Sequence, residues 1–369
     1  MATSRENNRA AAMRADIQKT LSCGISLASP TVYCLLNGVP DGTERPEQAF
    51  ASLKNVLWSR GGSSFDWRHL KYRGKANQST GPLRVRSFSE EDMWATPTIS
   101  TYMFDKTWGL GEGDLADNRH AGPQKQIDMK RESFALAVES IYAEYARAVW
   151  APNATNQNAG LSLFSPTNAG SASYAGIAMN STTTNGTDTF YYWSPTGYDY
   201  GTDGMDTDLL VNIIALKDQM TFSMRAGGGG GLSAPDFAVC AKTMWPVIST
   251  WFQTNASFNI ERVSNLQLLA NRSKMPNIIV DGIAIFPDDN FGGSTGYIDT
   301  AGSALEDVIL CTSSKFRLST TNTKAEGLIT THATGKNERA WLAGECGVAV
   351  TGKQGFAFLD PRGFQLLYT

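Results

Sequence analysis

The sequence contains no long apolar segment. The first twenty residues, MATSRENNRAAAMRADIQKT, have no apolar signal core, and no run of about 18 or more apolar residues follows in the 369-residue chain. A secretion signal needs an apolar core, and a membrane-spanning helix needs about 20 apolar residues in a row. We therefore expect neither of them, and we expect no membrane partner.

Charged residues are also scarce. Asp, Glu, Lys and Arg make up 18% of the chain, whereas an average globular domain has roughly 25%. The formal net charge is −3. The chain as a whole is therefore not a strongly basic nucleic-acid-binding protein.

The cysteines do not form a recognisable pattern. They are odd in number and widely spaced: Cys23, Cys34, Cys240, Cys311 and Cys346. No CxxC pair and no Cys/His cluster with the spacing of a zinc site occurs. We interpret them as reduced thiols, most of them buried, in a protein made in a reducing cytoplasm.

Metal-binding and catalytic motifs are missing as well. The three histidines, His69, His120 and His332, lie far apart and none belongs to an HExxH or HxH pattern. A triad of His332, Cys346 and an aspartate can be drawn on paper, but no nucleophile elbow surrounds any Ser or Cys. We expect no metal, no cofactor, no catalytic residue and no enzyme activity.

Two other motifs have structural interpretations. Five glycines, 227–231, lack the Lys-Ser/Thr that would follow in a phosphate-binding loop, so they indicate a flexible connection. Asp288, Asp289 and Asn290 follow an apolar run without the spaced oxygen ligands of a calcium loop, and they predict a turn.

Four segments have the apolar spacing of helices: 46–58, 124–150, 207–220 and 235–252. In the second of these the apolar stripe is Ile127, Phe134, Val138, Ile141, Tyr145 and Val149. Charged residues such as Glu144 and Arg147 fall elsewhere around that helix. About 25 residues at 1.5 Å each give a rod of roughly 35 Å, which is long for a globular helix. We expect Pro246 to kink or end the last of the four helices.

The remaining segments indicate strands and loops. Residues 59–122 lose the helical period, and we interpret them as a long hairpin-bearing segment with strand-like pieces at 65–67, 83–85 and 99–104. Residues 151–205 are rich in Asn, Ser, Thr and Tyr and hold too many aromatic residues for a solvated linker. Buried strands are predicted at 277–280, 282–286, 308–311, 316–318, 347–350 and 356–359. This order of helices and strands predicts an α+β fold.

A charged cluster lies within the hairpin-bearing segment. Its basic members are Arg68, Lys71, Arg73, Lys75, Arg84 and Arg86, and Glu90, Glu91 and Asp92 follow. The cluster is compatible with a solvated hairpin, with a contact across a subunit boundary, where complementary charge sets the register, or with nucleic acid. We assign these residues as inter-subunit contacts.

The order of these parts resembles that of tailed-bacteriophage major capsid proteins, which have the Hong Kong 97-type fold. The corresponding segments are an N-terminal arm (1–45), an extended loop (59–122), a spine helix (124–150) and two axial helices (207–220 and 235–252). NRSKMPNIIVDGIAIFPDDNF (271–291) and DVILCTSSKFRL (307–318) resemble strands of the axial sheet. The resemblance implies an extended loop region at 46–122, a peripheral domain at 123–205 and 346–369, and an axial domain at 206–345.

The resemblance also implies a function. The chain would be a structural subunit that self-assembles, as hexamers and pentamers, into an icosahedral shell around double-stranded DNA, without sequence-specific binding. Scaffold, portal and decoration proteins would be its further partners. It would be made in the host bacterial cytoplasm and would reside in the virion capsid.

Two alternatives remain open at this stage. An encapsulin-like nanocompartment shares the fold and packages protein. A β-rich carbohydrate-binding or hydrolytic protein would use exposed tryptophans as sugar platforms, and the candidates are Trp58, Trp67, Trp94, Trp108 and Trp193.

Overall fold

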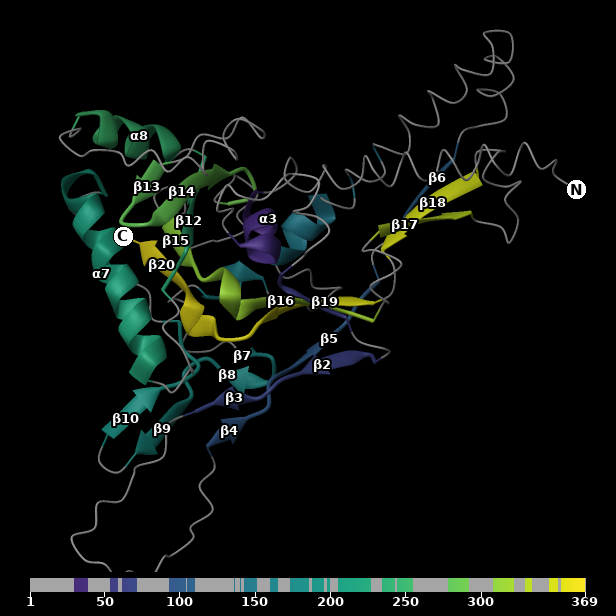
Figure 1. Cartoon of the computed structure of the whole chain (residues 1–369), viewed down its shortest axis with the longest axis horizontal. Coiled ribbons are helices and arrows are strands. Elements are labelled where there is room, and N and C mark those ends of the chain that lie inside the picture. Colours follow the sequence, from purple (N-terminus) through teal and green to yellow (C-terminus); the bar gives the residue numbers. More distant parts are fainter. Residues whose placement is uncertain are drawn as a thin grey trace, which may run out of the picture.

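The structure is a computed structural model. It describes residues 30–38, 54–58, 62–71, 93–103, 105–109, 136, 140, 143–150, 160–164, 173–185, 188–195, 198–199, 205–226, 234–242, 244–254, 278–291, 308–321, 329–333, 345–350 and 353–368. Helices and sheets pack into a central body. A two-stranded ribbon (residues 62–71 and 93–103) and a separate three-stranded sheet (residues 105–109, 329–333 and 345–350) extend from this body in different directions (Figure 1). The predicted mixture of helices and sheets is confirmed.

The body is built on a mixed six-stranded sheet. Its strand order is β11 (Tyr198–Asp199), β20 (Phe364–Tyr368), β15 (Val308–Cys311), β12 (Phe237–Ala241), β14 (Ile283–Asp288) and β13 (Ile278–Val280). β12 runs parallel to β14 and antiparallel to β15. The predicted strands β13, β14 and β15 are therefore confirmed, whereas β20 was not predicted.

The strand β12 corrects the prediction of a helix over 235–252. All five residues of Phe237–Ala241 are buried, so this run has neither a helical nor a strand period and fits a strand covered on both faces. The helix α8 (Trp245–Thr254) begins only afterwards. Pro246 is its second residue, where a missing N–H costs no hydrogen bond, so it neither kinks nor ends the helix.

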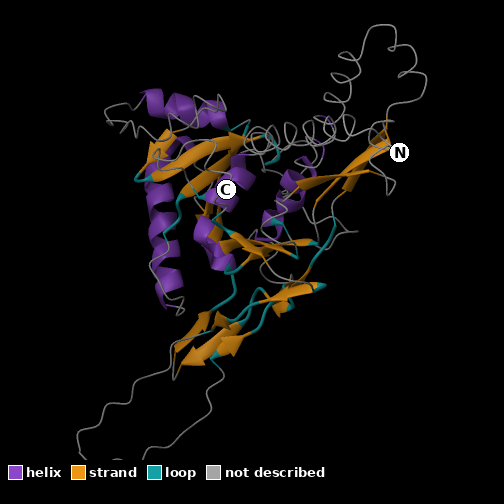
Figure 2. Ribbon diagram, turned by 45° about the vertical axis from the view of Figure 1, so that its right-hand side comes forward, coloured by secondary structure: helices purple, strands orange, loops and turns teal. Residues whose placement is uncertain are grey.

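Helix α7 (Met205–Ala226) confirms the predicted helix at 207–220 and extends it. Its residues Ile213, Leu216 and Met220 are buried, at the three- and four-residue steps of one helical face. Figure 2 shows the helices gathered around the sheets of the body, whereas the ribbon consists of strand and loop.

A three-stranded sheet lies beside the first and consists of β1 (Val56–Trp58), β16 (Phe316–Thr320) and β19 (Gln354–Phe358). β16 and β19 confirm two predicted strands. β1 corrects the end of the helix predicted over 46–58, because Val56 pairs in parallel with Leu318. Lys54 and Asn55 lie in a turn, and residues 46–53 lie outside the described residues.

Two long chain segments run through both sheets. β15 continues through a 3-10 turn, η3 (Ser313–Lys315), into β16, and β19 continues through η4 (Pro361–Gly363) into β20. The two turns lie next to each other. Hydrogen bonds from Thr312 N to Gly363 O (2.9 Å) and from Leu359 N to Lys315 O (2.7 Å) join a residue before or near one turn to the last residue of the other. Residues 364–368 were predicted to belong to the peripheral domain, but β20 pairs within the six-stranded sheet. Strand pairing alone does not define domains, so the four-part division stays a prediction.

Smaller elements complete the described part of the chain. They are η2 (Leu161–Phe164), the hairpin of β7 (Ser173–Tyr174) and β8 (Ile177–Ala178), and the hairpin of β9 (Thr182–Asn185) and β10 (Asp188–Tyr191). These strands agree with the interpretation of 151–205 as strand and loop. Residues 143–150 are helical, as predicted, with Tyr145 and Val149 buried and Glu144 and Arg147 exposed.

The sheet at the far end of the molecule consists of β17 (Ile329–Ala333), β18 (Glu345–Val350) and β6 (Asp105–Gly109). β18 is the central strand and is antiparallel to both neighbours. It confirms the strand predicted at 347–350, whereas β17 was not predicted.

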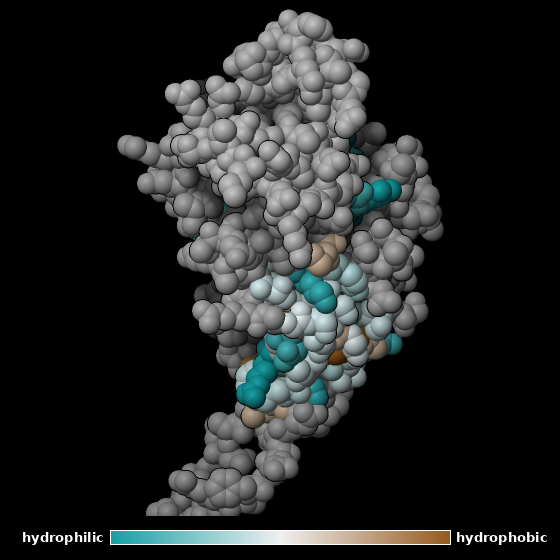
Figure 3. Space-filling view, turned by 90° about the vertical axis from the view of Figure 1, so that its right-hand side faces the viewer, coloured by the Kyte–Doolittle hydropathy of each residue, from teal (hydrophilic) through white to brown (hydrophobic). Residues whose placement is uncertain are grey.

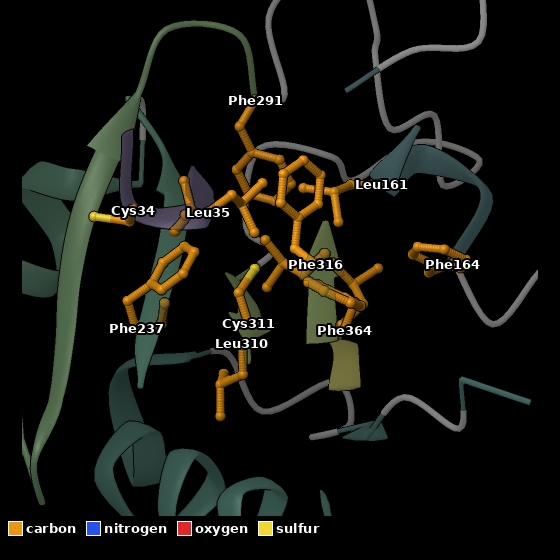
Figure 4. Close-up of a cluster of buried hydrophobic side chains, with 14 of the residues drawn as sticks. Cys34, Leu35, Leu161, Phe164, Phe237, Phe291, Leu310, Cys311, Phe316 and Phe364 are labelled. Carbon is orange, nitrogen blue, oxygen red and sulfur yellow. The ribbon is translucent and has the colours of Figure 1, made fainter. Parts of the chain in front are cut away.

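Helix α3 (Pro30–Asn37) packs in the core and was not predicted, because its residues were assigned to the N-terminal arm. Asn55 holds its end by donating from Nδ2 to Leu35 O (2.6 Å) and to Ser313 O (2.9 Å). Figure 4 shows Leu35 from α3 near Phe237 from β12 and Phe316 from β16. The described core therefore joins the N-terminal third of the chain to both sheets.

Candidate functional site: the ribbon and its base

The ribbon (residues 62–71 and 93–103) is an antiparallel pair of strands. β2 (Ser64–Asp66) pairs with β5 (Thr98–Ser100), and β3 (His69–Leu70) pairs with β4 (Trp94–Ala95). Thr101 N donates to Ser63 O (3.0 Å) at one end, and Lys71 N donates to Met93 O (2.8 Å) at the other. The predicted hairpin in 59–122 is thereby confirmed, although the strand-like piece at 83–85 lies outside the described residues.

The two faces of the ribbon differ. Successive side chains of a strand point to opposite faces, and exposure alternates accordingly. Phe65 and Trp67 are half-buried and His69 is buried, whereas Ser64, Asp66 and Arg68 are exposed. On the partner strand Trp94 is 49% exposed. One face therefore packs on the body and the other is open.

Hydrogen bonds fix the packed side of the ribbon to three segments of the body. Trp67 Nε1 donates to Leu359 O (3.0 Å), and Thr98 N donates to Ala175 O (3.0 Å). Tyr102 and Gln354 exchange two backbone bonds, of 2.7 and 2.6 Å. An isolated two-stranded hairpin is marginally stable, so these bonds are what gives the ribbon a defined direction.

An aromatic cluster fills the junction, and we call it the ribbon base: Trp67, His69, Tyr174, Tyr192 and Trp193. Tyr174 stacks on Trp193 at 6.0 Å between ring centroids, and the His69 ring meets Trp193 edge-on at 4.7 Å. Trp193 Nε1 donates to Tyr174 O (3.2 Å), and Tyr174 Oη accepts from Phe358 N (2.7 Å). Burial raises the pKa of Tyr174, which stays uncharged.

The ribbon base bears on the carbohydrate-binding alternative. Trp193 is fully buried and Trp67 is half-buried with its N–H bonded to the body, so neither is an open sugar platform. Trp94 is exposed, while the side chains of Trp58 and Trp108 lie outside the described residues.

A buried ion pair lies next to the ribbon base. Arg362 donates from Nε to Asp360 Oδ1 (2.9 Å) and from Nη2 to Asp360 Oδ2 (2.8 Å), and both side chains are almost completely buried. Burial by itself raises the pKa of Asp360, but the charge and hydrogen bonds of Arg362 outweigh it and hold the pKa at about 2. Such a two-point pair keeps both charges in the interior.

Neither this ion pair nor His69 was predicted as a site from the sequence. A local signal was present for the pair, because Asp-Pro at the start of a turn is a capping pattern, and Asp360 does accept from Arg362 N (3.1 Å). No local signal could reveal the ribbon base, whose members come from distant segments.

The predicted contact residues are only partly described. Arg68 is exposed on the open face, and Lys71 is half-buried at the end of the ribbon. Arg73, Lys75, Arg84, Arg86, Glu90, Glu91 and Asp92 lie outside the described residues, in the segment 72–92 that connects the two strands. Their role as inter-subunit contacts stays a prediction.

The cysteines and histidines are not gathered into a site within the described part of the chain. Cys34, Cys240 and Cys311 are buried and free, and burial raises the pKa of all three thiols, that of Cys240 to about 12. His332 pairs with Gly347, one position out of register with Cys346. No group of three His, Cys, Asp or Glu suited to a metal occurs among the described residues.

The predicted turn at 288–290 is confirmed. Asp288 Oδ1 accepts from the backbone N and the side-chain Nδ2 of Asn290, both at 2.9 Å, while its Oδ2 accepts from the Thr31 hydroxyl. Gly227–Gly231 lie outside the described residues.

Two surface properties complete the description. Figure 3 shows that the described surface on that side is mostly of intermediate hydropathy, with hydrophilic and hydrophobic residues next to one another. None of the helices in the described ranges is long and apolar enough to cross a membrane.

Comparison with known proteins gives likeness in structure but not in sequence. No protein-family model and no curated protein matches the sequence. The chain is similar to the capsid asymmetric unit of cyanophage A-1(L), at 13% identity and a TM-score of 0.47, covering 85% of this chain and 90% of that one. The chain is also similar to the capsid of cyanophage P-SCSP1u, at 12% identity and a TM-score of 0.47, covering 85% of each chain. It is similar as well to a virus-like particle from Pyrococcus furiosus, at 12% identity and a TM-score of 0.40, covering 85% of this chain and 91% of that one.

Proposed function

We propose that this chain is the major capsid protein of a tailed bacteriophage, a structural subunit without catalytic turnover that assembles into an icosahedral shell around the genome. The observation that carries the proposal is the ribbon. Its inner face is fixed to the body by Trp67, His69 and Tyr102, and its outer face is open. A ribbon attached in this way is suited to presenting the segment at its end to a neighbouring subunit.

The segment at the end of the ribbon has the charge expected of such a contact. Lys71 and Met93 close the ribbon, and between them the chain carries Arg73, Lys75, Arg84, Arg86, Glu90, Glu91 and Asp92. Basic and acidic blocks on one segment favour a fixed register against a complementary surface. Exposed ion pairs contribute only about 0–1 kcal/mol each, but a shell repeats every contact many times.

The order of elements also supports the proposal. The ribbon precedes the helix that includes 143–150, then α7, β12, α8 and the strands of the two sheets. A Hong Kong 97-type subunit has its extended loop, spine helix and axial domain in this order. We assign 1–45 as arm, 46–122 as extended loop region, 123–205 and 346–369 as peripheral domain, and 206–345 as axial domain.

In the proposed shell, copies associate through heterologous contacts that close by rotation into hexamers and pentamers. Each subunit would bury well over the roughly 800 Å² per partner of a standard interface. Double-stranded DNA would be enclosed without sequence-specific binding, with scaffold, portal and decoration proteins as further partners. Synthesis in the host bacterial cytoplasm and residence in the virion belong to the same proposal.

Assembly tests the proposal directly. The full chain is purified alone and after co-expression with the neighbouring phage gene products, and both samples are analysed by size-exclusion chromatography and negative-stain electron microscopy. Closed hollow particles are expected. A protein that stays monomeric at high concentration in both samples would refute the proposal.

A further inference from the structure

His69 joins the half of the ribbon formed by β3 and β4 to the body. The residue is 6% exposed, and its ring stacks on Tyr192 at 6.2 Å and meets Trp193 edge-on. Its Nε2 lies 3.1 Å from the carbonyl oxygen of Tyr192. Because a carbonyl oxygen only accepts, Nε2 carries the proton and donates it, which fixes the tautomer of the neutral ring.

The charged groups around His69 act on it in opposite directions. The charged groups that act on it are Asp360, Arg362 and Lys315. Asp360 is already matched by Arg362 at two points, so a proton on His69 would add an unmatched charge to a buried cluster. Burial is the largest cause, and it lowers the pKa of His69. Arg362 and Lys315 lower it further, whereas Asp360 and the hydrogen bond to the Tyr192 carbonyl oppose them.

The other half of the ribbon, formed by β2 and β5, has attachments of its own. Trp67 is bonded to Leu359, Thr98 to Ala175, and Tyr102 to Gln354. Beyond these bonds, β3 meets the body at His69, and β4 meets it at Ala95, which pairs with His69 and is itself buried in the core. A disturbance at His69 therefore acts on β3 and β4 and leaves β2 and β5 attached.

We propose that protonation of His69 releases β3 and β4 from the body while β2 and β5 stay in place, so that mild acid frees the end of the ribbon that carries residues 72–92. In the released state the imidazole is hydrated and has its ordinary pKa. The released state therefore binds more protons than the packed state, and its population rises as the pH falls below about 6.5. The opening itself does not depend on the proposed function, whereas its consequence for assembly does.

Hydrogen exchange measured by mass spectrometry tests the release. Protection factors, corrected for the intrinsic pH dependence of exchange, are compared at about pH 7.5 and pH 5.5. We expect protection of peptides covering 68–71 and 93–96 to fall severalfold, while protection around Thr98–Tyr102 stays constant. Unchanged protection at 68–71, or an equal loss in both regions, would overturn the proposal.

Two variants assign the effect to this residue. His69→Gln keeps an N–H donor for the Tyr192 carbonyl and cannot be protonated, so its exchange should not respond to pH. The matched control, His332→Gln in β17, should respond as the unsubstituted protein does. A pH response that persists in His69→Gln counts against the proposal.

A direct titration keeps the proposal testable even where His69→Gln fails to fold. The imidazole resonances of the unsubstituted protein report the pKa of His69, and a value at or above 6.5 would overturn the release mechanism. Particle formation at both pH values is scored separately. Release of β3 and β4 without any change in assembly would refute the contact role of 72–92 and leave the release itself established.

Discussion

The indole Nε1 of Trp67 donates a hydrogen bond to the carbonyl oxygen of Leu359 at 3.0 Å, across 292 positions of the sequence. Leu359 follows β19 and directly precedes Asp360 of the buried ion pair. The ribbon is therefore attached at the point where the chain passes from the three-stranded sheet toward the six-stranded sheet. Its direction depends on the same residues that join the two sheets.

Replacing Trp67 with Phe tests this attachment. The ring contacts with Tyr174 and Trp193 are largely kept, but the Leu359 carbonyl loses its donor. We expect the free energy of unfolding to fall by about 1–2 kcal/mol, as urea denaturation would measure. Trp94→Phe, in the exposed part of the ribbon, should change it by no more than about 0.5 kcal/mol. Equal effects in the two variants would show that the hydrogen bond is not what holds the ribbon.

Reversing charge on the ribbon tests the proposed contact. The triple variant Arg68→Glu, Arg73→Glu and Arg84→Glu should fold normally by circular dichroism and fail to form particles in sedimentation, because the complementary register is lost at every contact.

A matched variant separates location from net charge. Arg147→Glu, Lys242→Glu and Lys353→Glu reverse three exposed cations outside the ribbon and change the net charge by the same amount. Particles are expected from this control. If both variants assemble equally well, the ribbon cluster is only a solvated surface.

The thiols give a third prediction. Cys34, Cys240 and Cys311 are buried and free, and their raised pKa values keep them protonated at neutral pH. In the native protein these three should react with a thiol reagent only very slowly, because the thiolate is the reactive form. Without reductant, all five cysteines should titrate after denaturation. A count of one or three would mean that disulfides are present.

Sequence reasoning succeeded where the apolar pattern was decisive. The spacing in 207–220 predicted α7, because burial of one helical face gives a regular apolar period. Short apolar runs predicted β14, β15 and β19, because a strand buried on both faces is apolar throughout. It failed at Phe237–Ala241, where a fully apolar run fits a buried strand as well as a helix, and only pairing with β14 and β15 decides between them. It also failed at α3, whose eight residues lie in a segment interpreted as an arm.

The candidate site was predictable only in part. The hairpin and its charged residues could be inferred from the loss of helical period in 59–122 and from the local charge. The ribbon base could not, because Trp67, Tyr174 and Leu359 meet only through long-range packing. No spacing in the sequence encodes that meeting.

The buried ion pair gives the last prediction, on stability in acid. The folded pKa of Asp360, about 2, lies below its ordinary value of 3.8. The unfolded state therefore binds the proton more readily, and the stabilisation by this carboxylate is complete above about pH 4 and is lost as the pH falls toward 2. Its size is on the order of 2 kcal/mol. Asp360→Asn removes the carboxylate that pairs with the buried Arg362 and should cost about 3–5 kcal/mol at neutral pH, with a weaker dependence on pH between 4 and 2. Urea denaturation in a His69→Gln background separates this pH range from the titration of the histidine.

The double variant Asp360→Asn, Arg362→Met removes both charges and should be more stable than Asp360→Asn alone, because an unpaired buried charge costs more than a missing pair. If the double variant is the less stable of the two, Arg362 stabilises the interior by more than its pairing with Asp360, and the prediction is wrong.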